Sequence, residues 1–480
     1  MASSMSSLSR LCAIALFCIL ALPVVAQKYF SATKYPAPAN SYQGLSVSAD
    51  IDRDGNPDLL TTDEVNPQVL IWYGIGGGKF GSPEIVGNLD DLPTTIAVGD
   101  FNGDGRLDFL VGTAVHNNAV DVLINEGNRT FSKGSVSLPD SPGWIVTGDF
   151  NNDGKLDFAV SAYDVYNGAY VQIYTGNGDG TFNPGQQLMI SQGTYHLMTA
   201  DVNKDGKVDI INVAAPTTIF LNAGNATFTN AQNISVPNGG TYVWGSIGDL
   251  NGDAAPDLFL TNNQFCGEGC GWIKSLDTYL NDGTGHFTLS ASLQPTGSSD
   301  ESGVLADLNY DGKLDMVFGS DNELEFSLGN GNGTFQTVKP IGPLNGQYSD
   351  SSTQVLARDF NNDGLADLTS TASGSLLVAL NTAVKPDCLP PNSSALGSTV
   401  CSPLPGQTVN STFRVRAAAN GPVDIVRIEE WVDGKKLYQN LSNQVRNNLT
   451  LSSGSHSISI VSVDLLGGIS KNNFSITVKP

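Results

Sequence analysis

The sequence predicts an all-β chain, a seven-bladed β-propeller followed by a small β-sandwich. Three observations support this prediction. A nine-residue acidic motif recurs seven times, at intervals of 48 to 58 residues. Each interval holds short apolar runs separated by Gly, Asn and Asp clusters, as expected of strands joined by turns. After the last motif the apolar and polar residues alternate, which is typical of a two-layer sandwich.

The N-terminal segment has the composition of a secretory signal. Arg10 supplies a positive charge, Leu11 to Val25 form an apolar run, and Val24-Val25-Ala26 offers a small-residue cleavage site before Gln27. The alternative, a membrane anchor, is disfavoured because the run is short for a transmembrane helix. No later segment is apolar enough to span a bilayer. We therefore expect residues 1–26 to be removed and the mature protein to be secreted, either extracellular or at the cell surface.

Each repeat has the same internal order. A short strand enters the acidic motif, a second strand leaves it and a third follows, then a Gly/Asn turn ending in Phe, such as GDGTF at 178–182, leads to a fourth. Four strands in about 50 residues correspond to one propeller blade. Exit strands such as Phe109-Leu110-Val111 are apolar on consecutive residues, which fits sheets packed on both faces.

The propeller is predicted to occupy residues 27–385 and to close on itself. The seventh repeat, from Gln354 to about Ala383, offers only three strands. The segment from Lys28 to Tyr35 lies before the first motif and is long enough for one strand. We expect it to be the outer strand of the last blade, because a closed ring leaves only short, protected edges.

The acidic motifs have the composition of calcium-binding loops. Positions 1, 5 and 9 are Asp in all seven copies, position 3 is Asp52 or Asn, and position 6 is Gly except for Ala254. Oxygen donors at alternate positions around a glycine suit a hard cation. The predicted ligands, in which position 7 contributes only its backbone carbonyl, are Asp50, Asp52, Asp54, Asn56 and Asp58; Asp100, Asn102, Asp104, Arg106 and Asp108; Asp149, Asn151, Asp153, Lys155 and Asp157; Asp201, Asn203, Asp205, Lys207 and Asp209; Asp249, Asn251, Asp253, Ala255 and Asp257; Asp307, Asn309, Asp311, Lys313 and Asp315; Asp359, Asn361, Asp363, Leu365 and Asp367.

Two alternatives to calcium loops are weaker. Position 12 is never acidic, so the motif is not a helical EF-hand. Metal-free Asx turns would suit a single copy, but seven sets of three or four carboxylates would repel one another strongly. Mg²⁺ fits less well because it demands octahedral geometry and keeps its waters. We expect up to seven calcium ions, one per blade, with loop 5 the weakest because Ala254 replaces glycine.

These motifs resemble a known family. DFNGDGRLD at Asp100, DFNNDGKLD at Asp149 and the GDGTF-like turns are similar to FG-GAP/VCBS repeats. The resemblance implies a seven-bladed propeller with calcium in these loops, as in the head of integrin α-chains and in some fungal lectins. Members of the family bind proteins or sugars, and some belong to larger enzymes. The resemblance therefore implies the fold and the metal, and leaves the ligand open.

The C-terminal region, residues 386–480, is predicted to be a separate sandwich. Expected strands are 413–417, 425–428, 431–433, 457–461 and 474–478, with a hairpin turn at Asp433-Gly434. The runs WVDGKKLY and SGSHSISIVSVDLLGG resemble bacterial Ig-like domains, which act as spacers or adhesion units. Sequence proximity favours the disulfides Cys266–Cys270 and Cys388–Cys401. The alternative, a zinc site, lacks a nearby histidine.

Charge and composition narrow the function. The net charge is −23, which disfavours nucleic acid and anionic lipid as partners. Residues between strands on the face opposite the acidic loops are rich in aromatics, and the candidate ligand-binding residues are Trp144, Tyr195, His196, Tyr242, Trp244 and Trp272. The alternative is that these rings merely plug the mouth of the propeller.

The sequence contains no recognisable catalytic motif. It lacks a metalloprotease, deaminase or serine-hydrolase pattern and a phosphate-binding loop. We therefore predict a monomeric, non-catalytic module that binds an extracellular glycan or protein or mediates adhesion. The alternative is a polysaccharide lyase or hydrolase on a propeller scaffold, using a carboxylate pair such as Asp300-Glu301.

Overall fold

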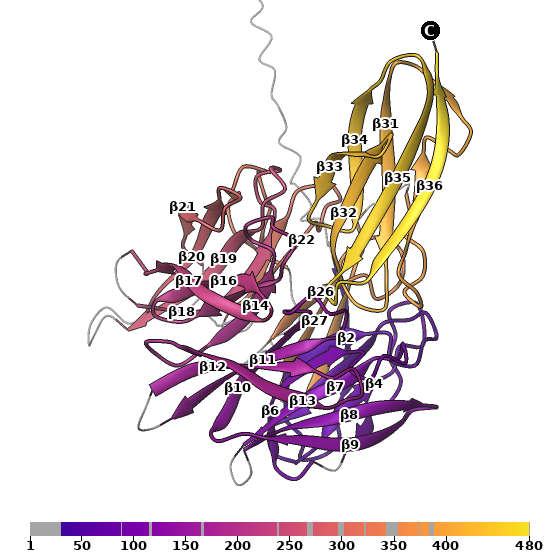
Figure 1. Ribbon diagram of the computed structural model, residues 1–480. Coiled ribbons are helices and arrows are strands. Elements are labelled where there is room, and N and C mark those ends of the chain that lie inside the picture. Colours follow the sequence, from indigo (N-terminus) through magenta and orange to yellow (C-terminus); the bar gives the residue numbers. More distant parts are fainter. Residues whose placement is uncertain are drawn as a thin grey trace, which may run out of the picture.

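The structure is a computed structural model that describes residues 30–87, 89–114, 118–164, 168–237, 240–265, 272–295, 302–320, 323–341, 354–372, 374–383 and 388–479. In these ranges the regular secondary structure consists of β-strands alone (Figure 1). None of the described segments is a helix long and apolar enough to cross a membrane. The prediction of an all-β chain is confirmed.

Seven four-stranded antiparallel sheets form the blades. Blade 1 comprises β2 (Gln43–Ala49), β3 (Asp58–Asp63), β4 (Val69–Trp72) and β5 (Glu84–Val86); blade 2, β6 (Leu92–Gly99), β7 (Asp108–Ala114), β8 (Ala119–Gly127) and β9 (Thr130–Ser137); blade 3, β10 (Ser141–Gly148), β11 (Asp157–Asp164), β12 (Gly168–Gly176) and β13 (Phe182–Met189); blade 4, β14 (His196–Ala200), β15 (Asp209–Val213), β16 (Thr217–Gly224) and β17 (Thr227–Ile234). Blade 5 comprises β18 (Thr241–Gly248), β19 (Asp257–Phe265), β20 (Trp272–Asn281) and β21 (Phe287–Leu293); blade 6, β22 (Gly303–Ala306), β23 (Asp315–Ser320), β24 (Glu323–Ser327) and β25 (Lys339–Pro340).

The seventh sheet joins the two ends of the propeller. It runs β26 (Val355–Arg358), β27 (Asp367–Ala372), β28 (Ser375–Asn381) and then β1 (Phe30–Pro36). Strand β1 pairs with β28 along seven residues, from Phe30 opposite Asn381 to Pro36 opposite Ser375. The predicted closing strand is therefore confirmed; within the described residues, which begin at Phe30, it ends one residue beyond the predicted segment. First strands of successive blades contact one another around the ring, including β2 with β26.

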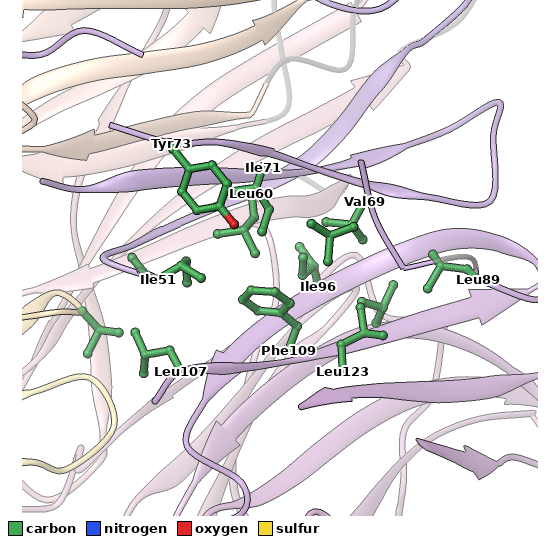
Figure 2. Close-up of a cluster of buried hydrophobic side chains, with 14 residues drawn as sticks. Ile51, Leu60, Val69, Ile71, Tyr73, Leu89, Ile96, Leu107, Phe109 and Leu123 are labelled. Carbon is green, nitrogen blue, oxygen red and sulfur yellow. The ribbon is translucent and has the colours of Figure 1, made fainter. Parts of the chain in front are cut away.

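Apolar side chains from adjacent blades form the core. Figure 2 shows one such cluster, in which Leu60 and Ile71 of blade 1 lie with Ile96 and Phe109 of blade 2. Phe109, Leu60 and Ile71 are fully buried. Similar clusters lie between other neighbouring blades. Packing on both faces explains why the second strands are apolar on consecutive residues, and it holds each acidic loop on a rigid support.

A recurrent asparagine joins neighbouring blades beside the acidic loops. In four blades one of the last three residues of the third strand is a buried asparagine: Asn125, Asn222, Asn281 or Asn381. In each case Nδ2 donates to the carbonyl of position 2 in the preceding blade's loop, at 2.7 to 3.2 Å. In blades 3 and 6 the backbone amides of Gly180 and Gly333 donate to the equivalent carbonyls instead, at 2.9 Å. These bonds couple consecutive loops around the ring.

The C-terminal region forms a sandwich of two sheets, as predicted. One sheet contains β29 (Gly397–Ser402), β31 (Thr412–Asn420) and β34 (Gln444–Thr450); the other contains β30 (Thr408–Val409), β36 (Ile469–Val478), β35 (Gly454–Asp464), β32 (Ile425–Val432) and β33 (Lys435–Asn440). The two strands expected at 425–428 and 431–433 are one continuous strand, β32, so that prediction was wrong. Glu429 and Glu430 interrupt the apolar pattern, yet both are buried within it.

The expected turn and one expected disulfide are present in the sandwich. Asp433 and Gly434 have φ of +49° and +80°, which gives the tight turn between β32 and β33. Cys388 and Cys401 are bonded and tie the connecting segment to β29. The other expected pair, Cys266 and Cys270, lies outside the described residues, as do the expected signal segment 1–26 and Asp300-Glu301.

Candidate metal loops and aromatic cluster

The seven acidic loops share one backbone conformation. Positions 4 and 6 have positive φ in every copy, including non-glycine residues such as Arg53, Lys204 and Tyr310. The carboxylate of position 1 accepts the amide of position 6 through Oδ2 in all seven loops, at 2.7 to 3.1 Å. The carboxylate of position 5 accepts the amide of position 7 at 2.7 to 3.0 Å. The loop thus curls around its own carboxylates, and positions 1, 3 and 5 face inward.

Position 9 fixes each loop to its blade. The seven aspartates at this position are fully buried. Their Oδ2 atoms accept the amide of position 2, at 2.8 to 3.0 Å. Their Oδ1 atoms accept an amide at the end of the third strand, at 2.7 to 2.8 Å. Oδ2 of Asp157 also accepts the amide of Asn151, at 3.2 Å. The Oδ1 atoms of all seven aspartates keep a second lone pair, so these carboxylates can still bind a cation.

The apolar residue at position 2 anchors the loop in its blade. All seven are buried, with exposed fractions of 0 to 3%. Three of them are Phe residues that meet the turn Phe of the next blade. The ring centroids of Phe101 and Phe182 lie 5.7 Å apart, and those of Phe150 and Phe228 lie 5.4 Å apart. These edge-on contacts add packing energy beyond burial alone.

Loop 1 offers the densest set of carboxylates. Ligand atoms of Asp50, Asp52 and Asp58 all lie within 4.8 Å of one another. In six loops Oδ1 of position 1 accepts the amide of position 5, but in loop 1 that amide, of Asp54, donates to Asp52. Oδ1 of Asp50 is buried, and because it does not accept that amide it has no hydrogen-bond partner among the described residues. A buried, unpartnered carboxylate oxygen is costly unless a cation or water meets it.

Loop 1 also carries the extra charge at position 3. Arg129 of blade 2 donates to Oδ2 of Asp52 at 2.7 Å, and its guanidinium lies over the ring of Tyr73. This ion pair offsets the additional carboxylate relative to the Asn of the other loops. The donor set of loop 1 is therefore comparable in charge to the rest, and the residues present fit a hard divalent cation.

Burial makes the carboxylates at position 9, and several of those at position 1, unfavourable as anions. It raises the pKa of Asp58 and Asp367 to about 8, and that of Asp209, Asp257 and Asp315 to about 7. At position 1, burial raises the pKa of Asp50, Asp307 and Asp359 to about 6. Neighbouring aspartates in the same loop add to the shift. A bound cation would reverse these shifts by stabilising the ionised form.

Loop 5 closes like the others despite Ala254. This alanine has φ of +62°, and its amide donates to Asp249 at 2.9 Å, as the glycine does elsewhere. The left-handed conformation costs a non-glycine residue roughly 1–2 kcal/mol. The loop therefore keeps its shape under strain.

Three of the six predicted aromatic-face residues come together. Trp144 in β10, His196 in β14 and Trp244 in β18 belong to the first strands of three consecutive blades. The imidazole of His196 stacks on Trp244 with centroids 4.1 Å apart, and Trp144 lies edge-on to both, at 4.6 and 5.3 Å. All three lie on strands that lead into the acidic loops, toward the end remote from them.

The cluster is fixed by hydrogen bonds. Nε1 of Trp244 donates to the carbonyl of Gly303 at 3.0 Å, and the amide of Gly245 donates to Nδ1 of His196 at 3.3 Å. Burial lowers the pKa of His196 to about 3, so the ring is neutral with its proton on Nε2. Trp144 and His196 keep some exposed surface, whereas Trp244 is 9% exposed. The cluster presents a rigid aromatic wall with ring N–H groups.

The other three residues do not join this cluster. Tyr242 is fully buried, and its hydroxyl contacts Asp277 and Tyr279 at 2.7 and 2.8 Å. The prediction that Tyr242 contacts a ligand was therefore wrong. Tyr195 is 47% exposed. Trp272 begins β20, and its side chain lies outside the described residues.

Two kinds of residue beside the loops were missed from the sequence. One is the asparagine at the end of the third strand, visible as a recurring Asn in VLIN, IFLN, TYLN and VALN. The other is Arg358, directly before position 1 of loop 7. The preceding six loops have Gly or Ala at this place, so the arginine was a detectable exception. Its guanidinium donates to carbonyls of blade 1 and of the C-terminal sandwich.

Comparison with known proteins agrees with this architecture. The FG-GAP-like repeat family matches residues 50–111, 112–160, 149–212 and 307–370, and the bacterial Ig domain family matches residues 398–460. No curated protein matches the chain. Among solved structures, a lectin of Agrocybe aegerita, described for specific recognition of non-reducing terminal N-acetylglucosamine, is 23% identical, with a TM-score of 0.46. That match covers 62% of this chain and 80% of the lectin. The chain is an FG-GAP-repeat β-propeller protein with a bacterial Ig domain at its C-terminal end.

Proposed function

We propose that this protein is an exported, calcium-stabilised propeller that acts as a binding or adhesion module for an extracellular glycan or protein. The observation that carries the calcium part is Oδ1 of Asp50, a buried oxygen without a partner among the described residues, in a set of three converging carboxylates. The same loop shape recurs in all seven blades. Calcium would supply the positive charge that these buried carboxylates lack.

The aromatic cluster is the proposed ligand surface. Trp144, His196 and Trp244 form a pre-organised wall whose rings lose little freedom when a ligand packs on them. Aromatic faces with ring N–H donors suit the C–H faces and hydroxyls of sugars, or a protein side chain. The acidic loops have a structural role in this proposal, since their carboxylates are engaged with backbone amides.

The calcium proposal is tested by metal analysis of the purified protein. After dialysis against calcium-free buffer, we expect several calcium ions per chain and a melting temperature that falls on addition of chelator. Less than one ion per chain, with a melting temperature indifferent to chelator, would contradict the proposal. Magnesium in place of calcium should restore little of the lost stability.

The ligand proposal is tested on glycan and protein arrays. Trp144→Ala should weaken any binding that the arrays detect, with calcium content and melting temperature nearly unchanged. Trp244→Ala should also weaken it, but with a lower melting temperature, because Trp244 is 9% exposed and donates a buried hydrogen bond to Gly303. Tyr163→Ala is a matched control, because Tyr163 is 57% exposed and stands outside the cluster. If both tryptophan variants bound normally, the aromatic cluster would not be the ligand-binding site. Turnover of polysaccharides, in a screen with and without chelator, would replace the binding role with an enzymatic one.

A further inference from the structure

The C-terminal domain packs on the face of the propeller that carries the acidic loops. Residues 421–423, between two of its strands, lie against β26 and β2 (Figure 1). The segment between β31 and β32 reaches loop 1, where the amide of Asp50 donates to the carbonyl of Pro422 at 2.9 Å. Next to it, Val423 is 4% exposed and packs in the cluster that contains Ala49 and Ile51. The domain therefore contacts the first residues of a predicted metal loop directly.

Arg358 joins three parts of the molecule at this point. It is 6% exposed and immediately precedes Asp359, the first ligand position of loop 7. Nη1 donates to the carbonyl of Ser48 in blade 1 at 2.7 Å, and Nη2 donates to the carbonyls of Gly421 and Pro422 at 2.9 and 3.0 Å. One side chain thus connects blade 7, blade 1 and the C-terminal domain.

Loops 6 and 7 contact the domain through position 4, which lies between two ligand positions. The guanidinium of Arg446 lies 3.3 Å from the ring centroid of Tyr310 and also donates to its carbonyl. The hydroxyl of Tyr310 donates to the carbonyl of Cys388 at 3.2 Å. Asn362 donates to the carbonyl of Gly55 in loop 1 at 3.1 Å and accepts from Asn420 at 3.4 Å. The backbone that curls around each ligand set is the backbone that holds the domain.

The domain covers loop 7 and one end of loop 1. Asp359 and Asp363 of loop 7 are 9 and 8% exposed, and Asp50 at position 1 of loop 1 is 1% exposed, whereas Asp54 at position 5 of loop 1 is exposed. The corresponding Asp100 and Asp149 are partly exposed, and Asp104 and Asp153 are exposed. Cations in loops 2 and 3 would exchange freely with solvent, whereas a cation in loop 7 would be enclosed by the docked domain and one in loop 1 would be covered on the side of Asp50.

We propose that the C-terminal domain and the cation sites of loops 1 and 7 form one coupled unit, in which an ordered, cation-filled pair of loops holds the domain and an emptied pair releases it. This inference rests on the calcium sites proposed above. Without the cation, repulsion between buried carboxylates distorts the segments around Asp50 and Asn362 that make the interdomain bonds. Linkage is reciprocal, so the docked domain raises the cation affinity of these loops by the same factor.

Small-angle X-ray scattering of the full protein, with calcium and with chelator, tests the coupling. We expect a larger maximum dimension and radius of gyration in chelator, and return to the compact values when calcium is restored. Asp363→Ala should expand the protein even in calcium. Asp153→Ala is the matched control, because it removes the same position-5 carboxylate from open loop 3 and should leave the protein compact.

The converse test removes the contacts and measures the metal. Arg446→Ala, on the surface of the C-terminal domain, should speed calcium release from a slowly exchanging fraction of the sites in a chelator-competition assay. Arg358→Ala should also speed calcium release. If Arg358→Ala does not fold, the result for Arg446→Ala alone tests the coupling. Bound calcium with unchanged scattering in chelator would overturn the coupling and leave the calcium sites intact. No bound calcium in the wild-type protein would overturn both proposals.

Discussion

Ala254 shows how a single residue strains a loop without opening it. Six loops have glycine at position 6, and the seventh adopts the same left-handed backbone with an alanine at φ +62°. Its carbonyl also accepts a hydrogen bond from Gln439 of the C-terminal domain, at 3.4 Å. The loop therefore keeps the shape of its neighbours at an energetic cost that glycine would not incur.

Ala254→Gly should stabilise blade 5. Relief of the left-handed strain contributes about 1 kcal/mol, less a few tenths for the greater freedom of glycine in the unfolded chain. We expect a small rise in melting temperature and tighter calcium binding at one site, measured by calorimetry and titration. Ala255→Gly is the control, because Ala255 does not have positive φ, and should be neutral or destabilising. Loss of stability in Ala254→Gly would contradict the strain argument.

Glu430 is a second residue held at a cost, in the core of the C-terminal sandwich. It is fully buried, Oε2 accepts from Asn447 at 3.1 Å, and Oε1 has no partner among the described residues. Burial raises its pKa to about 7. The folded state therefore binds the proton more tightly than the unfolded state, so the stability gained from that proton is complete below pH 4.5 and is lost as pH rises through about 7.

Glu430→Gln should stabilise the domain at pH 8 and change little at pH 5. The upper bound is about 3 kcal/mol, from roughly 1.4 kcal/mol for each unit of pKa shift. Thermal unfolding at the two pH values measures the difference. Glu429→Gln provides the contrast: burial there is outweighed by hydrogen bonds from Trp431 and Lys436, which lower its pKa, so its loss should destabilise the domain. If Glu430→Gln changed the stability equally at both pH values, ionisation of Glu430 would not be what destabilises the domain at pH 8.

At the scale of the element, the third strand of a blade does more than complete a sheet. In blade 4 the side chain of Asn222 donates to Phe150 and Val208 and accepts from Gly224, while its amide donates to Asp209. One residue at the strand end thereby holds its own loop and the loop of the preceding blade. The acidic loops are consequently parts of a continuous hydrogen-bonded ring.

Asn222→Ala should destabilise the propeller by about 2–3 kcal/mol, because it leaves two carbonyls and one amide without this partner in a buried site. Asn230→Ala is the matched control, since Asn230 is exposed on the fourth strand of the same blade and bonds only to Asn233. Resistance to proteolysis and melting temperature should fall in the first variant and hold in the second. If both variants behaved alike, the hydrogen bonds of the Asn222 side chain would not be important for the stability of the propeller.

Elements that depend on local pattern were predictable, and those that depend on distant contacts were not. The loop positions and the Asp433-Gly434 turn follow from residues near one another in sequence. The closing strand pairs distant residues, and it was predictable because the seventh repeat lacks one strand and the N-terminal segment supplies one. Tyr242 and Trp244 seemed equivalent because residues two apart share a face of a regular strand. A register shift between them separates their environments, so Tyr242 enters the core and Trp244 meets rings of other blades. The contacts of Arg358 with residues 421 and 422 span more than 60 positions and leave no local pattern.

At the scale of the whole molecule, the seven loops concentrate negative charge, and the repulsion between their carboxylates destabilises the folded ring. The chain has net charge −23, and 22 of its 47 acidic residues lie in the seven loops. All seven position-9 carboxylates have pKa values raised by burial, to between about 6 and about 8. Packing between blades holds these groups together, and a cation would relieve their repulsion at each loop.

The concentration of carboxylates predicts that the melting temperature changes with pH in opposite directions with and without calcium. In chelator, carboxylates with raised pKa bind protons more tightly in the folded than in the unfolded state. Their contribution to stability is therefore complete below about pH 4 and is lost as pH rises through 6 to 8. The melting temperature in chelator should fall steadily from pH 5 to pH 8.5. With saturating calcium, the ionised loops bind the metal, protons compete with it, and the melting temperature should rise over the same range before levelling off. Calorimetry across this range in the two conditions measures both slopes. Slopes of the same sign in chelator and in calcium would show that the loop carboxylates do not govern the stability of the ring.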